Sequence, residues 1–164
     1  MAELVGVAAI VASLVFVGLQ MRQAQDISLG QRAQSQAMNS IELTNAIKEH
    51  PEIWARGLAG EPLNATDSIV FDNLMKARND YAYFSSLASI ELGYESGANY
   101  YATSYGVFLF RNPGARQWFE AYASEDEEIV QLSRGSVILG DWYRQIRAVW
   151  AEIEQTEDHG SRPE

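Results

Sequence analysis

The chain of 164 residues is 47% hydrophobic and 11% aromatic, and its formal net charge is −10. This composition suffices for the hydrophobic core of one small domain and argues against a disordered chain. The negative charge argues against nucleic acid as a partner, and against anionic lipid as a partner of the body. Because the chain has no cysteine, disulfides, thiolate catalysis and cysteine-based zinc or iron–sulfur sites are excluded.

The most apolar stretch is Leu4–Leu19, which carries no charge. As a helix it would be about 24 Å long, short of the roughly 30 Å hydrocarbon core of a bilayer, and flanking residues lengthen it. No Lys or Arg precedes the run and no good cleavage site follows it, which disfavours a secretory signal. We therefore predict a single-pass transmembrane anchor over residues 1–22, in contact with lipid through residues 4–21. A buried core helix and a cleaved signal peptide are the alternatives.

Two features of this stretch bear on topology and assembly. Basic residues follow the apolar run at Arg22, Arg32 and Lys48, which favours a cytoplasmic body. Small residues recur four positions apart, at Ala2 and Gly6, Ala8 and Ala12, and Ala9 and Ser13, a spacing that lets two helices approach closely in lipid. They define a candidate helix-pairing face, made of Ala2, Gly6, Ala9 and Ser13. The alternative is that small residues are simply common in transmembrane helices.

Residues 23–49 are polar, free of proline and rich in Gln and Ala, so the spacing predicts a stalk helix that continues out of the anchor. Spacings of three and four alternate along a heptad-like row, Ala24, Ile27, Gln31, Gln34, Met38 and Ile41. Because the row contains two Gln, we favour a stalk that the downstream domain half covers over a coiled coil.

Residues 50–154 are predicted to form an aromatic-rich helical bundle. His50-Pro51 ends the stalk, a short helix covers residues 51–56, and residues 57–64 form a loop. Asn64 or Thr66 caps a long helix that reaches about Ser96. Its predicted core face is Val70, Leu74, Ala77, Tyr81, Phe84 and Ala88.

Four further helices and one turn complete the predicted bundle. An aromatic helix covers residues 99–110, a Pro-Gly turn follows at residues 111–114, and a short helix covers residues 115–123. Ser124 and Glu127 read as the capping box of a new helix that breaks or bends near Gly135. The last helix, residues 139–153, has the clearest amphipathic pattern. Residues 155–164 are predicted to be an unordered tail. Because every predicted regular element is a helix, the chain is predicted to be all-α.

The chain resembles a group of small uncharacterised bacterial proteins with one N-terminal span and an all-helical body. The resemblance is carried by residues 11–23 (VASLVFVGLQMRQ), 52–64 (EIWARGLAGEPLN), 71–86 (FDNLMKARNDYAYFSS) and 112–122 (NPGARQWFEAY). It does not extend to the acidic run after Ala123 or to the last helix. The resemblance implies a location in the bacterial inner membrane and a helical fold. The group has no assigned activity, so the resemblance implies nothing about catalysis or binding.

No pattern of residues predicts catalysis, a metal or a cofactor. The two histidines, His50 and His159, are far apart in sequence, and nucleophile elbows and phosphate-binding loops are missing. Aromatic residues at helical spacing are usually core, but they can also line a pocket for an apolar or anionic ligand. The candidate pocket residues are Arg78, Tyr81, Tyr105, Trp118 and Tyr122.

Two functions follow from these observations. The first is a membrane-tethered, non-catalytic interaction or assembly protein, either a homo-oligomer or a subunit of a membrane complex. The second is a membrane-anchored sensor that binds a small ligand between aromatic helices.

Overall fold

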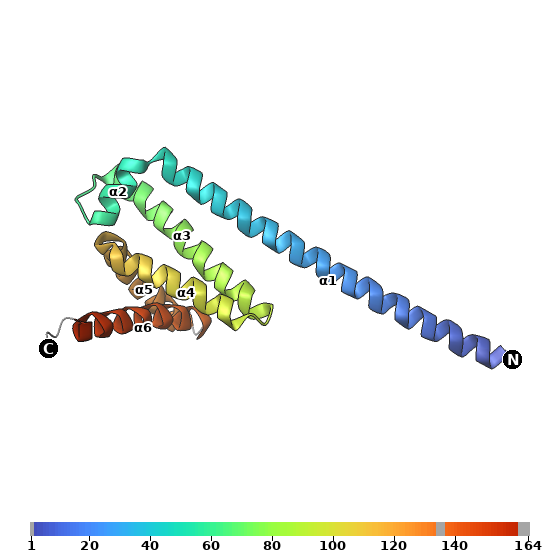
Figure 1. Cartoon of the computed structure of the whole chain (residues 1–164). Coiled ribbons are helices and arrows are strands. Elements are labelled where there is room, and N and C mark those ends of the chain that lie inside the picture. Colours follow the sequence, from blue (N-terminus) through green and yellow to red (C-terminus); the bar gives the residue numbers. More distant parts are fainter. Residues whose placement is uncertain (1, 134–136, 161–164) are drawn as a thin grey trace. The chain divides into compact units, whose positions relative to one another are not determined.

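The computed structural model describes the backbone of residues 2–133 and 137–160, and the side chains of residues 13–25, 27–32, 34–128 and 140–157. Within these ranges the regular structure is helical (Figure 1), which confirms the all-α prediction. The chain divides into two compact units, Met1–Ile41 and Glu42–Glu164.

The first unit consists of most of α1, Ala2–Glu49. The predicted anchor and stalk therefore belong to one uninterrupted helix. Among the residues that the structure describes, no helix has a stretch both long and apolar enough to cross a membrane. The structure therefore does not support the predicted transmembrane anchor. The side chains of residues 1–12, and with them Ala2, Gly6 and Ala9 of the candidate pairing face, lie outside the described residues.

The second unit begins with the end of α1 and a short helix, α2, Pro51–Ala59. Pro51 lies in the first turn of α2. Proline has no backbone N–H, and at this position the N–H would have no partner within the helix, so no hydrogen bond is lost. The helix continues past the predicted end at Gly57. It stops at Gly60, whose φ of 76° is left-handed and whose N–H reaches the carbonyls of Arg56 and Gly57. The predicted loop is therefore reduced to the residues after Ala59.

The longest helix of the second unit is α3, Ala65–Glu91. Its N-cap is Asn64, whose side chain accepts a hydrogen bond from the Asp67 N–H at 2.9 Å, as predicted. The predicted core face is right at Leu74, which is buried, and wrong at Ala77, which is exposed, and at Phe84, which is 61% exposed. The face that packs inward carries three polar residues among apolar ones, in the order Phe71, Leu74, Met75, Asn79, Ala82, Ser85 and Ser86.

The helix α3 also ends earlier than predicted. Gly93, with a φ of 75°, allows a tight turn into α4, Glu95–Arg111, and the Tyr94 N–H closes the turn on the Ser89 carbonyl at 2.8 Å. The two helices form a hairpin and pack along each other (Figure 1). The buried Ser86 hydroxyl lies 3.3 Å from the Ala98 carbonyl across this hairpin.

The capping box predicted at Ser124 does not form. The helix α5, Pro113–Ser133, runs through this position without a break, and the Ser124 hydroxyl donates to the Glu120 carbonyl one turn earlier, at 2.8 Å. A serine inside a helix commonly bonds this way. The predicted break at Gly135 lies outside the described residues.

The last helix is α6, Val137–Gly160. As predicted, its apolar face is in the core, with Trp142, Tyr143, Ile146 and Trp150 buried. Because α6 continues to Gly160, residues 155–160 are helical and the tail predicted from Gln155 is wrong there. Residues 161–164 lie outside the described residues. The core is thus enclosed by α3, α4, α5 and α6, with α2 covering α3 and α5.

Candidate functional site

Tyr105 on α4 lies at the centre of the aromatic core. Its ring stacks on Phe108 and on Trp142, with 6.0 Å between ring centroids in each case, and meets the edge of Phe119. The side chain is 3% exposed and its hydroxyl has no hydrogen-bond partner among the described residues. Burial raises the pKa of this hydroxyl, so Tyr105 stays protonated. A buried hydroxyl without a partner is unusual, because each such group forgoes its hydrogen bonds with water.

The indole N–H groups of three tryptophans, in contrast, have partners. Trp142 donates to the Asn79 side-chain oxygen at 3.2 Å, and Trp150 donates to the Gly106 carbonyl at 2.9 Å. Trp118 donates to the Asp72 carboxylate at 2.9 Å. These bonds tie α5 and α6 to α3 and α4 at fixed positions. Polar residues on the inner face of α3, Asn79 above all, therefore belong to the architecture of the core.

Arg78 lies on the same side of α3 as this aromatic cluster. Its guanidinium carbon sits 3.8 Å from the centre of the Phe108 ring, a cation–π contact. The side chain is half-buried, its Nε is buried without a hydrogen-bond partner, and among the described residues no carboxylate forms an ion pair with it. Burial accordingly lowers the pKa of Arg78, because desolvation disfavours the charged form.

Three carboxylates and a lysine lie between α3, α5 and α6. Lys76 and Trp118 donate to Asp72, and their hydrogen bonds outweigh burial, so that the pKa of Asp72 is lowered. Burial raises the pKa of Asp80. Asp126 accepts a hydrogen bond from the Tyr143 hydroxyl at 2.5 Å, and burial followed by this bond raises the pKa of Tyr143.

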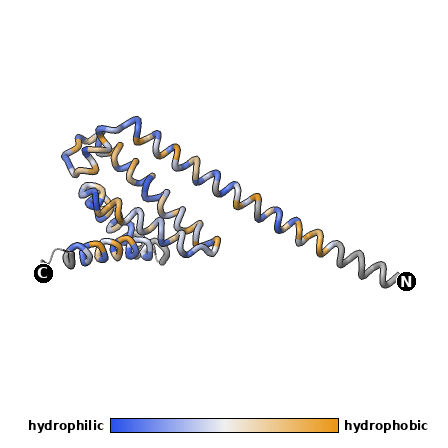
Figure 2. Tube along the Cα trace, in the orientation of Figure 1, coloured by the Kyte–Doolittle hydropathy of each residue, from blue (hydrophilic) through white to orange (hydrophobic). Residues whose placement is uncertain are grey.

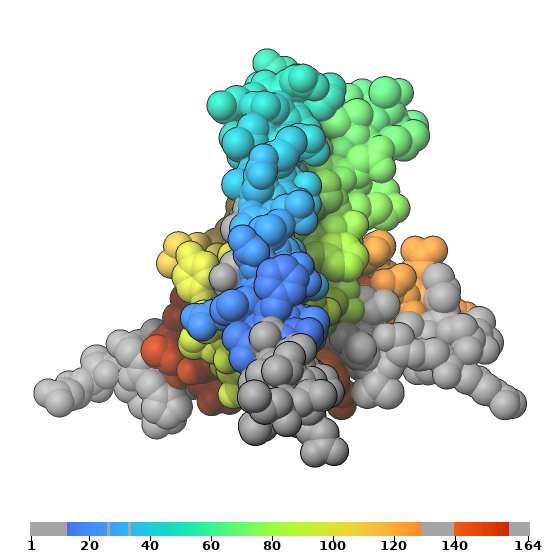
Figure 3. Space-filling view, turned by 90° about the vertical axis from the view of Figure 1, so that its right-hand side faces the viewer, coloured from blue at the N-terminus to red at the C-terminus, as the bar shows by residue number. Residues whose placement is uncertain are grey.

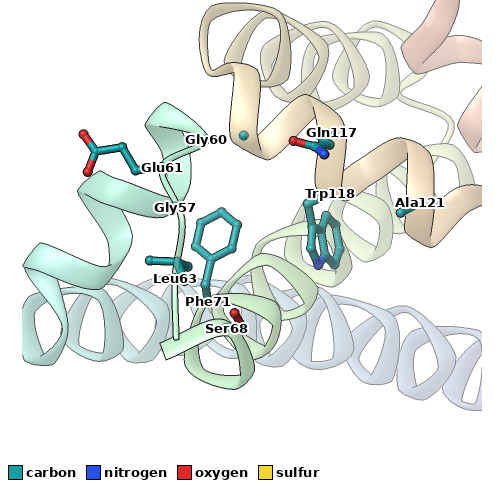
Figure 4. Close-up of a pocket in the computed structure, with 10 residues that line it drawn as sticks. Gly57, Gly60, Glu61, Leu63, Ser68, Phe71, Gln117, Trp118 and Ala121 are labelled. Atoms are coloured by element: carbon teal, nitrogen blue, oxygen red, sulfur yellow. The ribbon is translucent and has the colours of Figure 1, made fainter. Parts of the chain in front are cut away.

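A shallow hollow of about 320 Å³ lies between α2, α3 and α5. Three glycines bring the backbones of α2 and α5 together here. A Cβ on Gly114 would lie 1.9 Å from the Gly57 carbonyl oxygen and 2.6 Å from the Gly60 nitrogen. Figure 4 shows the Phe71 ring between the two helices and the Glu61 carboxylate pointing away from the hollow. The polar residues that line the hollow are Glu61, Ser68 and Gln117, and the other lining residues are glycines and apolar side chains.

The five predicted pocket residues do not form one pocket. Trp118 lines the hollow, whereas the other four are absent from its lining. Tyr122 stacks on Trp118 at 4.8 Å, on the side of α5 that faces Lys76. Arg78 and Tyr105 share contact with Phe108, and Tyr81 meets Tyr101 edge-on at 6.4 Å. The structure thus places the five residues at three sites, with Trp118 and Tyr122 on α5, Arg78 and Tyr105 against Phe108, and Tyr81 against Tyr101.

The contacts that join the elements include residues which the sequence analysis did not single out. Asn79 and Asp72 bind tryptophans of other helices, and Gly57, Gly106 and Gly114 allow close approach of neighbouring elements. Both the GLAGEPLN and the NPG segments contain glycine. Because glycine permits close approach of two backbones, these glycines could have predicted the contact between α2 and α5. Nothing in the sequence around Asn79 predicts that its side chain faces the core.

Within the described part of the chain, no group of three or more His, Asp or Glu side chains is arranged to hold a metal ion. No protein-family model, no curated protein and no solved structure matches the chain.

Proposed function

We propose that the chain is a membrane-tethered, non-catalytic helical protein whose second unit docks on a protein partner or on other copies of the chain. In this proposal the first unit is the tether, anchored through residues 4–21. The body lies on the cytoplasmic side of the bacterial inner membrane, as the basic residues after the apolar run favour.

The observation that carries this proposal is the apolar surface of α1. Leu14 is 67% exposed, and Phe16 and Leu19 are each 61% exposed. Figure 2 shows the described part of this stretch as a continuous hydrophobic segment. Each Å² of apolar surface left in water is unfavourable by about 25 cal/mol. Contiguous exposed apolar surface of this kind marks contact with a membrane or with another protein.

Membrane fractionation of cells that express the full chain tests the tether. We expect the protein in the membrane pellet after alkaline carbonate extraction. Replacing both Leu14 and Val17 with Asp should release it, because an acidic residue at the centre of a membrane helix costs about 2.5–3.5 kcal/mol. The matched control is Leu29→Asp, which lies on the same helix beyond the apolar run and should stay in the pellet. Release of the wild-type chain by carbonate would refute the tether.

A second candidate function, a ligand sensor, is favoured by the group around Phe108. Arg78 is a half-buried cation for which the described residues supply no carboxylate, and the Tyr105 hydroxyl beside the same ring has no hydrogen-bond partner. A small aromatic carboxylate would satisfy the guanidinium and extend the aromatic stack.

Thermal unfolding in the presence of millimolar benzoate tests the sensor, with inorganic phosphate as a second probe. Binding to the folded state raises the midpoint temperature, and the increase should vanish in Arg78→Met. If neither probe changes the midpoint of the wild-type chain, the sensor proposal fails.

Native mass spectrometry after extraction in mild detergent separates the two functions. A defined oligomer or a co-purifying protein supports docking, whereas a monomer that carries a small bound mass supports sensing.

A further inference from the structure

One row of residues runs along the described part of α1 at intervals of seven, Ser13, Gln20, Ile27, Gln34 and Ile41. Residues seven apart in a straight α-helix differ by about 20° in direction, and the left-handed supercoil of two paired helices removes this drift, so the row can stay at one contact. A second row, Val17, Ala24, Gln31 and Met38, alternates with it at spacings of three and four. We name the nine residues the α1 seam. All nine are exposed, and the described surface of α1 is visible in blue to cyan in Figure 3.

The seam joins two patterns of the sequence, the small residues of the apolar run and the heptad-like row of the stalk. Ser13 belongs to the candidate pairing face of the apolar run, and Ile27, Gln34 and Ile41 belong to the heptad-like row of the stalk. Because α1 is continuous from Ala2 to Glu49, both patterns lie on one helix and share one face. Ile27, Met38 and Ile41 are 58%, 53% and 59% exposed, which leaves apolar surface for another helix.

The distribution of charge indicates what that other helix is. Between residues 13 and 41 the charged residues are Arg22, Asp26 and Arg32, and their heptad positions all lie on the side away from the seam. The positions that flank the seam carry no charge, and several are small, Ser28, Gly30, Ser35 and Ala37 among them. An identical helix can therefore approach closely and would meet no like charge across the contact.

The glutamines of the seam favour one arrangement of two identical helices. Gln20, Gln31 and Gln34 each carry both a donor and an acceptor, so each can bond to its own counterpart when the helices are parallel and in register. Polar residues at seam positions are known to fix register and orientation at some cost in stability. The next positions of the same pattern are Asn45 and Lys48. In a parallel pair, Lys48 would face the Lys48 of the second copy, and the two like charges would repel each other. The seam therefore ends at Ile41, which is also the last residue of the first unit.

We propose that α1 pairs with the α1 of a second copy of this chain, parallel and in register, through the seam from Ser13 to Ile41. This inference rests on the proposed tether, because anchoring in one membrane aligns the two helices and raises their local concentration. It goes beyond the proposed function by assigning the partner, the surface and the register.

Cysteine cross-linking tests the pairing directly, because the chain has no cysteine of its own. The test variant is Gln34→Cys, in the full chain in native membranes under mild oxidation. The matched control is Gln36→Cys, the same substitution on the opposite side of the helix. A disulfide requires Cβ atoms about 3.5–4.5 Å apart, so we expect roughly tenfold or more disulfide-linked dimer for Gln34→Cys than for Gln36→Cys.

A second position, Gln20→Cys, tests orientation and register. In the parallel arrangement both Gln20→Cys and Gln34→Cys form disulfide-linked dimers, because every seam residue faces its counterpart. An antiparallel pair brings only one level of the seam opposite itself. Cross-linking at one of the two positions alone, at neither, or equally at Gln34 and Gln36 would overturn the proposal.

Carbonate fractionation of the same membranes distinguishes failure of the pairing from failure of the tether. Protein that stays in the pellet but does not cross-link refutes the pairing and leaves the tether intact. Protein that is released by carbonate refutes the tether, whatever the cross-linking shows. Circular dichroism of each variant verifies that helix content is unchanged.

Discussion

At the scale of single residues, the second unit depends on glycines that let backbones touch. The contact between Gly114 of α5 and the end of α2 has no room for a Cβ, since the atoms it would meet belong to the backbone and cannot swing away. Gly106 is in a comparable position, because its Cβ would lie 2.8 Å from a Val149 methyl group and its carbonyl receives the Trp150 indole.

The first prediction concerns Gly114→Ala. We expect the free energy of unfolding to fall by about 2–3 kcal/mol, because the new methyl group separates α2 from α5. Chemical denaturation measures the change. Gly140→Ala is the control, since no described atom lies within 4 Å of its added Cβ, and it should gain up to about 1 kcal/mol from helix propensity. Equal effects of the two substitutions would contradict the close contact.

The second prediction concerns Trp150, which is 3% exposed. Trp150→Ala should lower the free energy of unfolding by about 3–5 kcal/mol through loss of packing. Trp150→Phe keeps most of the ring but removes the indole hydrogen bond to the Gly106 carbonyl, so its loss should be smaller, about 1–3 kcal/mol. A loss below about 1 kcal/mol for Trp150→Ala would place this side chain on a surface instead.

At the scale of elements, α3 holds carboxylates whose pKa values move in opposite directions. Hydrogen bonds from Lys76 and Trp118 lower the pKa of Asp72 below its ordinary 3.8 despite burial, so the ionised form stabilises the fold. That stability is present above pH 3.8 and is lost as the pH falls through the folded pKa. Burial raises the pKa of Asp80 above 3.8, so its ionised form destabilises the fold until it is protonated.

The third prediction follows from these signs and compares Asp72→Asn with Asp80→Asn. At pH 7 we expect Asp72→Asn to be less stable than the wild-type chain and Asp80→Asn to be more stable. As the pH falls, the advantage of Asp80→Asn should shrink first, between the folded pKa of Asp80 and 3.8, and the deficit of Asp72→Asn should shrink only below 3.8. Denaturation curves between pH 3 and pH 7 provide the measurement. If both substitutions changed the free energy of unfolding in the same direction at pH 7, the opposite pKa shifts of Asp72 and Asp80 would be contradicted.

The positions of the helices were largely predictable from the sequence, but the face that each presents to the core was less so. The pattern of α6 is unambiguous because Trp142, Ile146 and Trp150 recur at helical spacing among charged residues. On α3 the inward face includes the polar residues Asn79, Ser85 and Ser86. Asn79 and Ser86 form hydrogen bonds with Trp142 and Ala98 on other helices, and a pattern of apolar residues does not predict a face of this kind. Ser124 shows the same limit, since its sequence suits a helix cap but α5 continues through it.

The candidate site was predictable to a similar extent. Arg78 and the aromatic residues near it were recognisable as an unusual combination. Their division into a group at Phe108 and a pair on α5 depends on how α4, α5 and α6 pack against α3, which no local spacing encodes. The glycine contacts between α2 and α5 likewise join segments far apart in sequence.

At the scale of the whole molecule, the two units have different proposed roles. The first unit, Met1–Ile41, is proposed to hold the chain in the membrane and to pair with a second copy. The second unit, Glu42–Glu164, contains the aromatic core and is proposed to dock on a partner. The junction between Ile41 and Glu42 is therefore the place where the two roles can be separated.

A protease recognition sequence inserted at this junction in the full chain tests that division most directly. After cleavage of the membrane-bound protein and alkaline carbonate extraction, which removes docked proteins, we predict that the second unit is released into the supernatant while the first unit remains in the pellet. Release of the first unit into the supernatant, or retention of the cleaved second unit in the carbonate-washed pellet, would contradict the proposed division of roles.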